Sequence, residues 1–224
     1  MGRRKRRYSS GYNRSYKRRY RVKPRFFVIF FVLIGVISGA AYWFLHDGVN
    51  EVLPVTAVQL EQGNRIMLGA RAYINTDLTY DDKYYGGGYP PDNLGVCTDV
   101  VWKGFMKINV DLKTLVDLDI SKHMGNYKGV VSTPDPNIDF RLVPTLEVFF
   151  ANNAQVLTTD VKDLLAWQPG DIVTFESSHV AIISDRRNLF GHPYVIQHGK
   201  DPAGEEDRLF AADGMKISGH YRWK

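Results

Sequence analysis

The sequence predicts an α+β domain that follows a basic tail and one membrane-spanning helix. Three observations predict this organisation. Residues 1–25 carry twelve lysines and arginines and no acidic residue, and residues 26–45 are twenty residues without a charge. In the remaining body, helical patterns come first and short β-type runs separated by turns come second. Helices followed by an antiparallel meander are the pattern of an α+β fold.

The basic character of the chain belongs to its tail. The whole sequence has a formal net charge of +5. Once the twelve bases of residues 1–25 are set aside, residues 26–224 keep 17 bases against 24 acids, a net charge of −7. The basic pI therefore does not indicate a nucleic-acid-binding protein. We expect the tail to lie against anionic lipid headgroups, where each nearby basic residue contributes about 1 kcal/mol.

Residues 26–45 predict a retained transmembrane helix. A helix of twenty residues is about 30 Å long, which matches the hydrocarbon core of a bilayer. The segment lacks the polar stripe of a core helix. It is also longer than the core of a usual signal peptide, the alternative that the small residues 38–41 leave open. Because the basic block precedes the span, the positive-inside rule places the N-terminus in the cytoplasm. After a linker at 46–54, residues 55–224 form an extracytoplasmic domain.

The body begins with helices and a loop and ends in strands. Helical periodicity is expected at about 55–72, 97–108 and 113–123. Between the first two helices, residues 80–91 contain three consecutive glycines, two prolines and clustered tyrosines, among them Tyr85. A loop of this kind often borders a binding cleft. Strands are expected at 171–175, 179–184, 194–198 and 217–223.

Cys97 is the only cysteine of the chain. In an oxidising compartment a thiol that cannot pair within the chain is a liability unless it has a role, although an inert buried cysteine is the alternative. Cys97 begins the helix expected at 97–108. A helix N-terminus stabilises a thiolate, and its backbone N–H groups can stabilise an oxyanion on an attacked carbonyl. The pattern therefore indicates a catalytic thiol.

A thiol nucleophile needs a base, and His179 is the candidate. It begins an apolar strand after two serines, so its imidazole can project from the strand end towards a helix terminus. An unperturbed imidazole, with a pKa of about 6.5, can take the thiol proton and later protonate the leaving amine. A third polar group must orient the imidazole. The neighbouring strand offers Gln197 and His198, which point to opposite faces of the sheet.

Five segments together resemble a known family: GVCTDVVWKGF at 95–105, PDPNIDFRLVPTLEVFF at 134–150, WQPGDIV at 167–173, SHVAIISDRRN at 178–188 and ISGHYRW at 217–223. They are similar to an uncharacterised family of extracytoplasmic bacterial domains grouped with the NlpC-type cell-wall peptidases, the bacterial papain-like thiol hydrolases. The resemblance covers about residues 60–224. It implies a papain-like core in which the cysteine heads a helix packed on an antiparallel sheet. By that similarity Cys97 is the nucleophile and His179 is the base.

The third catalytic position departs from the family pattern. Related domains usually have Ile-His-Asn where this chain has Ile196-Gln197-His198. Strict alignment assigns the orienting role to Gln197, whose side-chain carbonyl can accept the imidazole N–H. A shift by one residue assigns it to His198. The departure also leaves open a domain of reduced or lost activity.

Three further residues are candidates for substrate binding. Asp99 lies in the first turn of the helix, where a carboxylate either stabilises the helix dipole or contacts a substrate amine. Tyr85 belongs to the loop expected beside the cleft, and His220 near the C-terminus is placed to border the site. Asp171, in the sequence PGD, is expected to be a turn residue.

The predicted function is hydrolysis of an amide bond in peptidoglycan, through a thioester intermediate and without a cofactor. The location outside the membrane indicates the substrate, and the resemblance indicates the reaction. A wall-binding or scaffolding domain with the same fold is the main alternative. A zinc hydrolase using His179, His198 and His220 is disfavoured because no HExxH or paired-ligand spacing is present. A serine hydrolase is disfavoured because no GxSxG motif is present.

Overall fold

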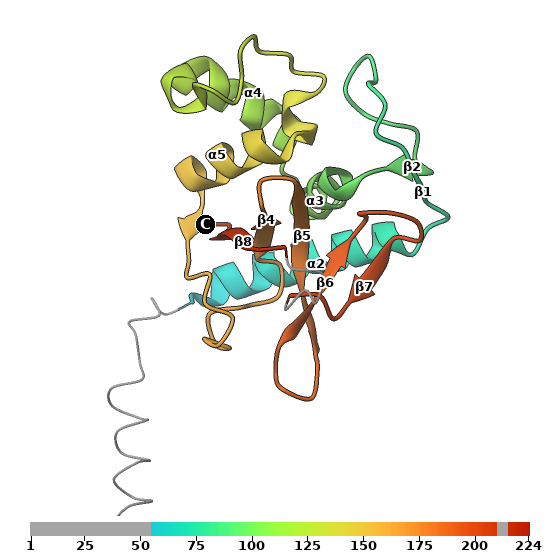
Figure 1. The fold of residues 1–224 in the computed structure, drawn as a ribbon, viewed down its shortest axis with the longest axis vertical. Coiled ribbons are helices and arrows are strands. Elements are labelled where there is room, and N and C mark those ends of the chain that lie inside the picture. The colour runs from blue at the N-terminus through green and yellow to red at the C-terminus, as the bar shows by residue number, and fades with distance from the viewer. Residues whose placement is uncertain (1–54, 210–214) are drawn as a thin grey trace, which may run out of the picture. The chain divides into compact units, whose positions relative to one another are not determined.

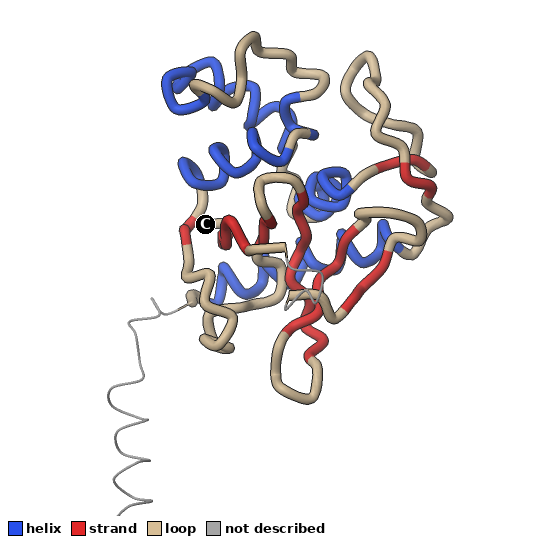
Figure 2. Tube along the Cα trace, viewed as in Figure 1, coloured by secondary structure: helices blue, strands red, loops and turns tan. Residues whose placement is uncertain are grey.

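Helices and strands are segregated along the chain, with four α-helices before a six-stranded sheet (Figures 1 and 2). The computed structural model describes residues 55–209 and 215–224. The predicted basic tail, transmembrane helix and linker, at residues 1–54, lie outside the described residues. Within the described ranges, no helix is both long and apolar enough to cross a bilayer.

The helices begin where side chains can satisfy their first N–H groups. Thr56 and Gln59 form a capping box at the start of α2, and Asp111 accepts from the Thr114 N–H at the start of α4. Such caps are worth about 1 kcal/mol each. Pro144 lies in the first turn of α5, where its missing N–H is not needed. The helices are α2 (Ala57–Ile74), α3 (Cys97–Met106), α4 (Leu112–His123) and α5 (Val143–Asn153), with the 3₁₀ turns η1 (Met124–Tyr127) and η2 (Asp139–Arg141).

The main sheet is antiparallel throughout, with the strand order β3-β8-β4-β5-β6-β7. The last strand along the chain, β8, inserts between β3 and β4. A separate pair of short parallel strands, β1 (Thr79–Tyr80) and β2 (Leu94–Gly95), brackets the Gly- and Tyr-rich loop. The strands of the main sheet are β3 (Gln155–Val156), β4 (Ile172–Phe175), β5 (His179–Arg187), β6 (Pro193–Gln197), β7 (Gly204–Glu206) and β8 (Ile217–Arg222).

The two faces of the sheet belong to two separate hydrophobic cores. Val180 and Ile182 of β5 pack with the residues of α2, α3, α4 and α5 in the larger core. Ala181 and Ile183, which alternate with them, belong to a smaller core that contains Trp167. This alternation is the period-2 pattern of a strand that is buried on both sides.

Helix α3 is held against α2 by a close backbone approach. At Gly104 a Cβ atom would lie 2.9 Å from the Ile66 carbonyl oxygen, closer than any side chain can come. Both helices also contact β5 and β6, and Figure 1 shows α2 passing across these strands. The contact between α2 and α3 therefore fixes where the start of α3 meets the sheet.

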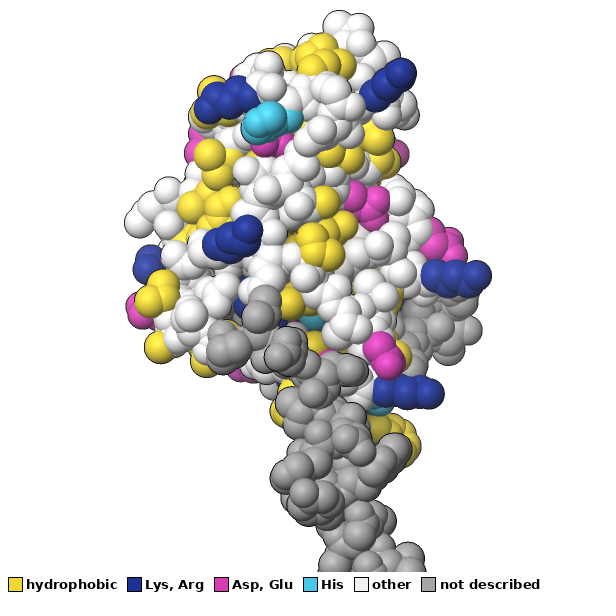
Figure 3. Space-filling view, turned by 90° about the vertical axis from the view of Figure 1, so that its left-hand side faces the viewer, with side chains coloured by type: hydrophobic (Ala, Val, Ile, Leu, Met, Phe, Trp, Pro, Cys, Tyr) yellow, Lys and Arg dark blue, Asp and Glu magenta, His cyan; other side chains and the backbone are white. Residues whose placement is uncertain are grey.

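The α+β prediction is confirmed. The helices expected at 55–72, 97–108 and 113–123 are α2, α3 and α4, and the four expected strands are β4, β5, β6 and β8. Five helices and strands of the described residues were not predicted: α5, β1, β2, β3 and β7. The sequence of α5 mixes β-branched and aromatic residues after a proline, and β3 and β7 are too short to show a period. On the face shown in Figure 3, charged side chains of both signs are scattered among uncharged ones.

Candidate functional site

The site begins at the first residue of α3, Cys97, whose side chain is half-buried. The nearby backbone N–H groups of Val180, the second residue of β5, and of Thr98 act to lower the pKa of its thiol. Burial nevertheless dominates and raises the pKa of the Cys97 thiol. The helix terminus therefore does not outweigh burial, and Cys97 needs a base to lose its proton.

Asp99 fixes the start of α3 from inside the protein. Its carboxylate is fully buried and accepts from the Val96 N–H at 2.8 Å and from the Trp102 indole N–H at 2.6 Å. The Arg141 guanidinium donates to both of its oxygens, at 2.9 and 2.8 Å. The predicted contact between Asp99 and a substrate amine is corrected accordingly, because the carboxylate has neither exposure nor an unused oxygen. Asp99 holds Cys97 in place instead.

Tyr85 contacts the buried pair of Asp99 and Arg141, and it does not line the cavity beside His179. The Arg141 guanidinium lies 5.4 Å from the centre of the Tyr85 ring, within cation–π distance. Burial and a hydrogen bond with Asp81 raise the pKa of the Tyr85 hydroxyl. In this structure Tyr85 ties the Gly- and Tyr-rich loop to the body, so its predicted role in substrate binding is not supported by its position.

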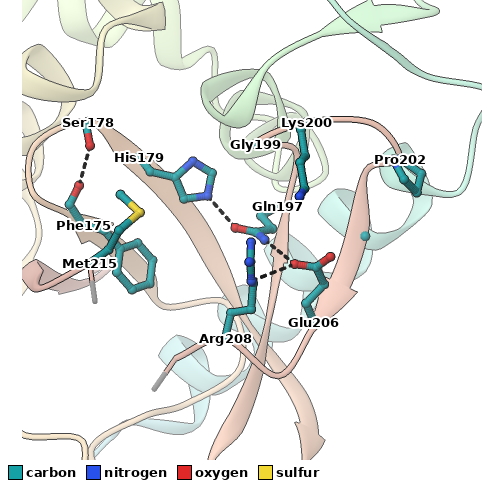
Figure 4. Close-up of a pocket in the computed structure, with 11 residues that line it drawn as sticks. Phe175, Ser178, His179, Gln197, Gly199, Lys200, Pro202, Glu206, Arg208 and Met215 are labelled. Atoms are coloured by element: carbon teal, nitrogen blue, oxygen red, sulfur yellow. Dashed lines mark hydrogen bonds and ion pairs between the residues drawn. The ribbon is translucent and has the colours of Figure 1, made fainter. Parts of the chain in front are cut away.

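His179, the first residue of β5, is paired with Gln197, the last residue of β6. The Nε2 atom of His179 lies 2.5 Å from Gln197 Oε1 (Figure 4). The amide nitrogen of Gln197 in turn donates to Glu206 Oε2 on β7, at 2.6 Å. The same carboxylate oxygen lies 3.4 Å from Arg208 Nε. The imidazole is therefore oriented by a chain of polar side chains that crosses three neighbouring strands.

The strand register explains how these side chains meet. Ile182 of β5 pairs with Ile196 of β6, and continuing this antiparallel register places Gln197 diagonally from His179 on the same face. The pairing of β6 with β7 places Gly204 opposite Gln197, so Glu206 is again the diagonal neighbour. The register therefore places one polar side chain from each of the three strands in a row, namely His179, Gln197 and Glu206.

His198 points to the other side of β6, as alternation requires. Its side chain is fully buried, its Nε2 lies 3.0 Å from Asp201 Oδ1, and its ring meets the edge of the Tyr80 ring at 5.5 Å between centres. Of the two residues proposed to orient the imidazole, the structure pairs His179 with Gln197. His198 braces the segment that follows β6.

A cavity of about 350 Å³ opens next to His179, Gln197 and Glu206 (Figure 4). Phe175 and Met215 form its apolar wall. The polar residues that line it include His179, Gln197, Lys200, Glu206 and Arg208. The cavity lies beside the imidazole, whereas Cys97, which packs against the larger core, is not among the residues that line it.

His220 lies elsewhere, in a buried ionic cluster. Its Nε2 lies 3.0 Å from Asp171 Oδ2 and its Nδ1 lies 2.7 Å from the Thr158 carbonyl oxygen, while its ring stacks on Trp167 at 3.7 Å. Arg222 donates to both oxygens of Asp171 at 2.7 Å. The predicted place of His220 at the border of the site is thus wrong. Asp171 does brace its turn, through the Gln168 N–H, but it is also the centre of this cluster.

The three histidines of the zinc alternative contact three different partners, namely Gln197, Asp201 and Asp171. Over residues 55–209 and 215–224, no group of three His, Cys, Asp or Glu side chains is arranged to hold a metal ion. The donor geometry described here therefore does not favour a metal centre.

Sequence reasoning missed two residues that contribute to the site. Glu206 ends a strand of three residues, GEE, that has no hydrophobic pattern. Tyr80 also lies near Cys97: burial raises the pKa of its hydroxyl, and the charge of a Cys97 thiolate would raise it further. Both depend on long-range strand pairing that local patterns do not encode.

The comparisons with known proteins identify the family. A family model described as a domain of unknown function, DUF1287, matches residues 67–223. The chain is 35% identical over 190 residues to the uncharacterized protein YijF of Escherichia coli (strain K12), a match that covers 80% of this chain and 91% of that protein. No solved structure matches the chain. The chain therefore belongs to the DUF1287 family.

Proposed function

We propose that the protein is a thiol hydrolase that cleaves an amide bond in peptidoglycan, with Cys97 as nucleophile, His179 as base and Gln197 as the residue that orients the imidazole. One observation carries the proposal. Helix α3, which begins at Cys97, packs against β5, and the backbone N–H of Val180, the residue that follows His179, is close enough to lower the pKa of the Cys97 thiol. A helix-heading cysteine against an antiparallel sheet, with a histidine on that sheet, is also the arrangement of a papain-like core.

The residues can perform the reaction in two halves. Because Gln197 engages Nε2 of His179, the proton of the Cys97 thiol passes to Nδ1. The thiolate then forms a C–S bond with the amide carbonyl carbon. The backbone N–H groups around the sulfur are donors of the kind that stabilise the resulting oxyanion. The C–N bond breaks as His179 protonates the leaving amine, and a thioester remains.

Water completes the cycle. His179 removes a proton from a water molecule, whose oxygen attacks the thioester carbonyl. The C–S bond breaks, the carboxylic acid leaves, and the sulfur recovers its proton from the imidazolium. No cofactor is required.

The proposed substrate follows from the proposed location. A basic cytoplasmic tail at 1–25 that contacts anionic headgroups, and a membrane-spanning helix at 26–45, would hold residues 55–224 on the outer side of the cell membrane. Peptidoglycan is the amide-rich polymer there. Its stem peptides carry free carboxylates, which Lys200 at the cavity can meet.

A second candidate is a wall-binding domain of the same fold without hydrolytic activity. The raised pKa of the Cys97 thiol favours it, since a buried, protonated thiol is a poor nucleophile. In that case the cavity would bind stem peptides without forming a thioester.

A digestion assay distinguishes the two candidates. The full-length protein in detergent micelles is incubated with purified peptidoglycan, and new free amines and released fragments are measured beside the Cys97→Ser variant. If the protein is a hydrolase, wild type should release fragments and Cys97→Ser should release none. Equal behaviour of the two proteins over a panel of peptidoglycan chemotypes would refute the thiol mechanism, and retained binding would then support the second candidate.

A further inference from the structure

We infer that Glu206 is a positioning residue that fixes which way round the Gln197 amide lies, and thereby which nitrogen of His179 carries the proton. The catalytic consequence rests on the proposed function, in which Nδ1 of His179 accepts the proton of the Cys97 thiol. The geometry itself does not depend on that function.

The inference starts from the two different ends of a side-chain amide. A glutamine presents a carbonyl oxygen that only accepts and an NH₂ group that only donates. Gln197 lies between two polar neighbours, with Oε1 at 2.5 Å from His179 Nε2 and its nitrogen at 2.6 Å from Glu206 Oε2. An ionised carboxylate accepts hydrogen bonds and donates none. Glu206 therefore requires the NH₂ group on its own side, which leaves the carbonyl for His179.

The consequence is a defined tautomer of the base. Since the Gln197 carbonyl can only accept, His179 must donate from Nε2. In a neutral imidazole with its proton on Nε2, the other nitrogen is an acceptor. A reversed amide would offer its NH₂ group to Nε2, and the proton would then sit on Nδ1. A protonated Nδ1 cannot take the thiol proton, so the orientation of the amide decides whether His179 is a base.

The fold provides the contact in two ways. Gly204 stands opposite Gln197 in the register, and a Cβ at that glycine would lie 3.5 Å from Glu206 Cγ and 3.7 Å from Glu206 Oε1. Both are ordinary van der Waals distances, so the Glu206 side chain packs over Gly204, directly opposite Gln197 in the register. In addition, Arg208 pairs with the same carboxylate oxygen that Gln197 contacts. Gln197 itself is only 7% exposed, so water has little access to compete for its amide.

The test reads the tautomer directly, by ¹⁵N NMR of the full-length protein labelled at its six histidines. His179 is assigned from the signals lost in His179→Gln. In wild type at neutral to alkaline pH we expect His179 protonated on Nε2. In Glu206→Gln the new amide can donate as well as accept, so we expect a substantial Nδ1-protonated population and a fall of at least tenfold in kcat. Glu206→Ala, which removes the acceptor without adding a donor, should do the same.

Two further variants distinguish an effect of hydrogen-bond direction at Gln197 from a general disturbance of the structure. Glu205→Gln is the same change one residue earlier on β7, on the opposite face, where Glu205 pairs with Arg71 at 2.7 Å. We expect it to leave the His179 tautomer unchanged. The exchange Gln197→Glu with Glu206→Gln keeps the net charge and puts an acceptor-only group beside His179. It should restore the Nε2-protonated form that Glu206→Gln loses.

An unchanged His179 tautomer in both Glu206→Gln and Glu206→Ala would overturn the inference, as would a double exchange that fails to restore it. The outcome is distinct from that of the proposed function. A tautomer that responds as expected in a protein without hydrolytic activity would leave the positioning role standing and remove the enzyme proposal. An active protein whose His179 tautomer does not change in the Glu206 variants would keep the enzyme proposal and remove the positioning role.

Discussion

Two histidines of the sheet, His179 and His220, show how differently one residue type is used in one fold. Each lies on a strand and faces an oxygen acceptor. His220 is fully buried, stacks on Trp167 and has both nitrogens engaged, one of them by the carboxylate of Asp171. His179 is half-buried, lines a cavity, and faces the neutral amide of Gln197.

The difference teaches which neighbours leave a histidine available for chemistry. A carboxylate at hydrogen-bond distance and a stacked indole fix a ring as part of the core. A neutral amide orients a ring through one nitrogen and leaves its protonation free to change, which is what a general base requires. The comparison therefore supports the chemical role proposed for His179 and makes His220 part of the core, and it can be tested at either residue.

The largest effect is expected from removing the base. His179→Ala should lower the rate of peptidoglycan hydrolysis by about 10²–10⁴-fold, the usual contribution of a general base. Its thermal unfolding should change little, because His179 lies at a strand end beside the cavity. Initial rates of amine release and a melting curve measure both. Full activity in His179→Ala would place the base elsewhere.

The opposite result, a loss of stability with little change in rate, is expected from disrupting the buried cluster around Asp171. Asp171→Ala leaves the Arg222 guanidinium buried without its partner, and breaking a buried ion pair in this way costs about 3–5 kcal/mol of unfolding free energy. Urea unfolding measures the loss. The rate per folded molecule should stay close to wild type, since Asp171 does not line the cavity. A variant of unchanged stability would contradict the structural role.

A smaller effect is expected from crowding the imidazole. A Cβ at Gly199 would lie 3.2 Å from His179 Cε1, closer than ordinary contact, so Gly199→Ala must displace the ring by a few tenths of an ångström. Small misplacements of catalytic groups are costly, and we expect roughly tenfold loss of kcat. Gly125→Ala, in η1, where a Cβ would meet no atom within 4 Å, is the comparison variant and should keep its activity. Equal kcat values in all three proteins would show that the ring position is not critical.

The smallest effect is an alkaline loss of stability. Burial raises the folded-state pKa of the Cys97 thiol above its ordinary value of 9.0. Above that ordinary value the unfolded chain loses the thiol proton while the folded protein retains it. The unfolded state then binds fewer protons, and the free energy of unfolding falls as pH rises. Wild type should therefore lose stability relative to Cys97→Ser from about pH 9 upward, and parallel curves would contradict the burial of the thiol.

Much of the architecture was predictable because it rests on local patterns. The helix that begins at Cys97 and the strand that begins at His179 both follow from hydrophobic periodicity. Alternation along β6 also separated Gln197 from His198 before the structure showed which of them meets the imidazole. In these cases the information lies within a few residues of the feature it predicts.

The remaining features depend on contacts between distant parts of the chain. Asp99 looked like an exposed dipole cap until Arg141, 42 residues later, proved to bury it. His220 looked like a neighbour of the site because strand order cannot be deduced from a single strand, and β8 inserts on the far side of β4. Glu206 reaches Gln197 only through the β6–β7 register. Local sequence carries no record of such pairings.

The most direct test of the central claim is to trap the covalent intermediate on Cys97. The full-length protein is incubated with soluble stem-peptide fragments, quenched in acid and measured by intact-protein and peptide mass spectrometry. We predict an adduct with the mass of the acyl fragment on the peptide that contains Cys97, released by hydroxylamine and absent from Cys97→Ser. Cleaved fragments without any such adduct, formed at the same rate by Cys97→Ser, would contradict the account.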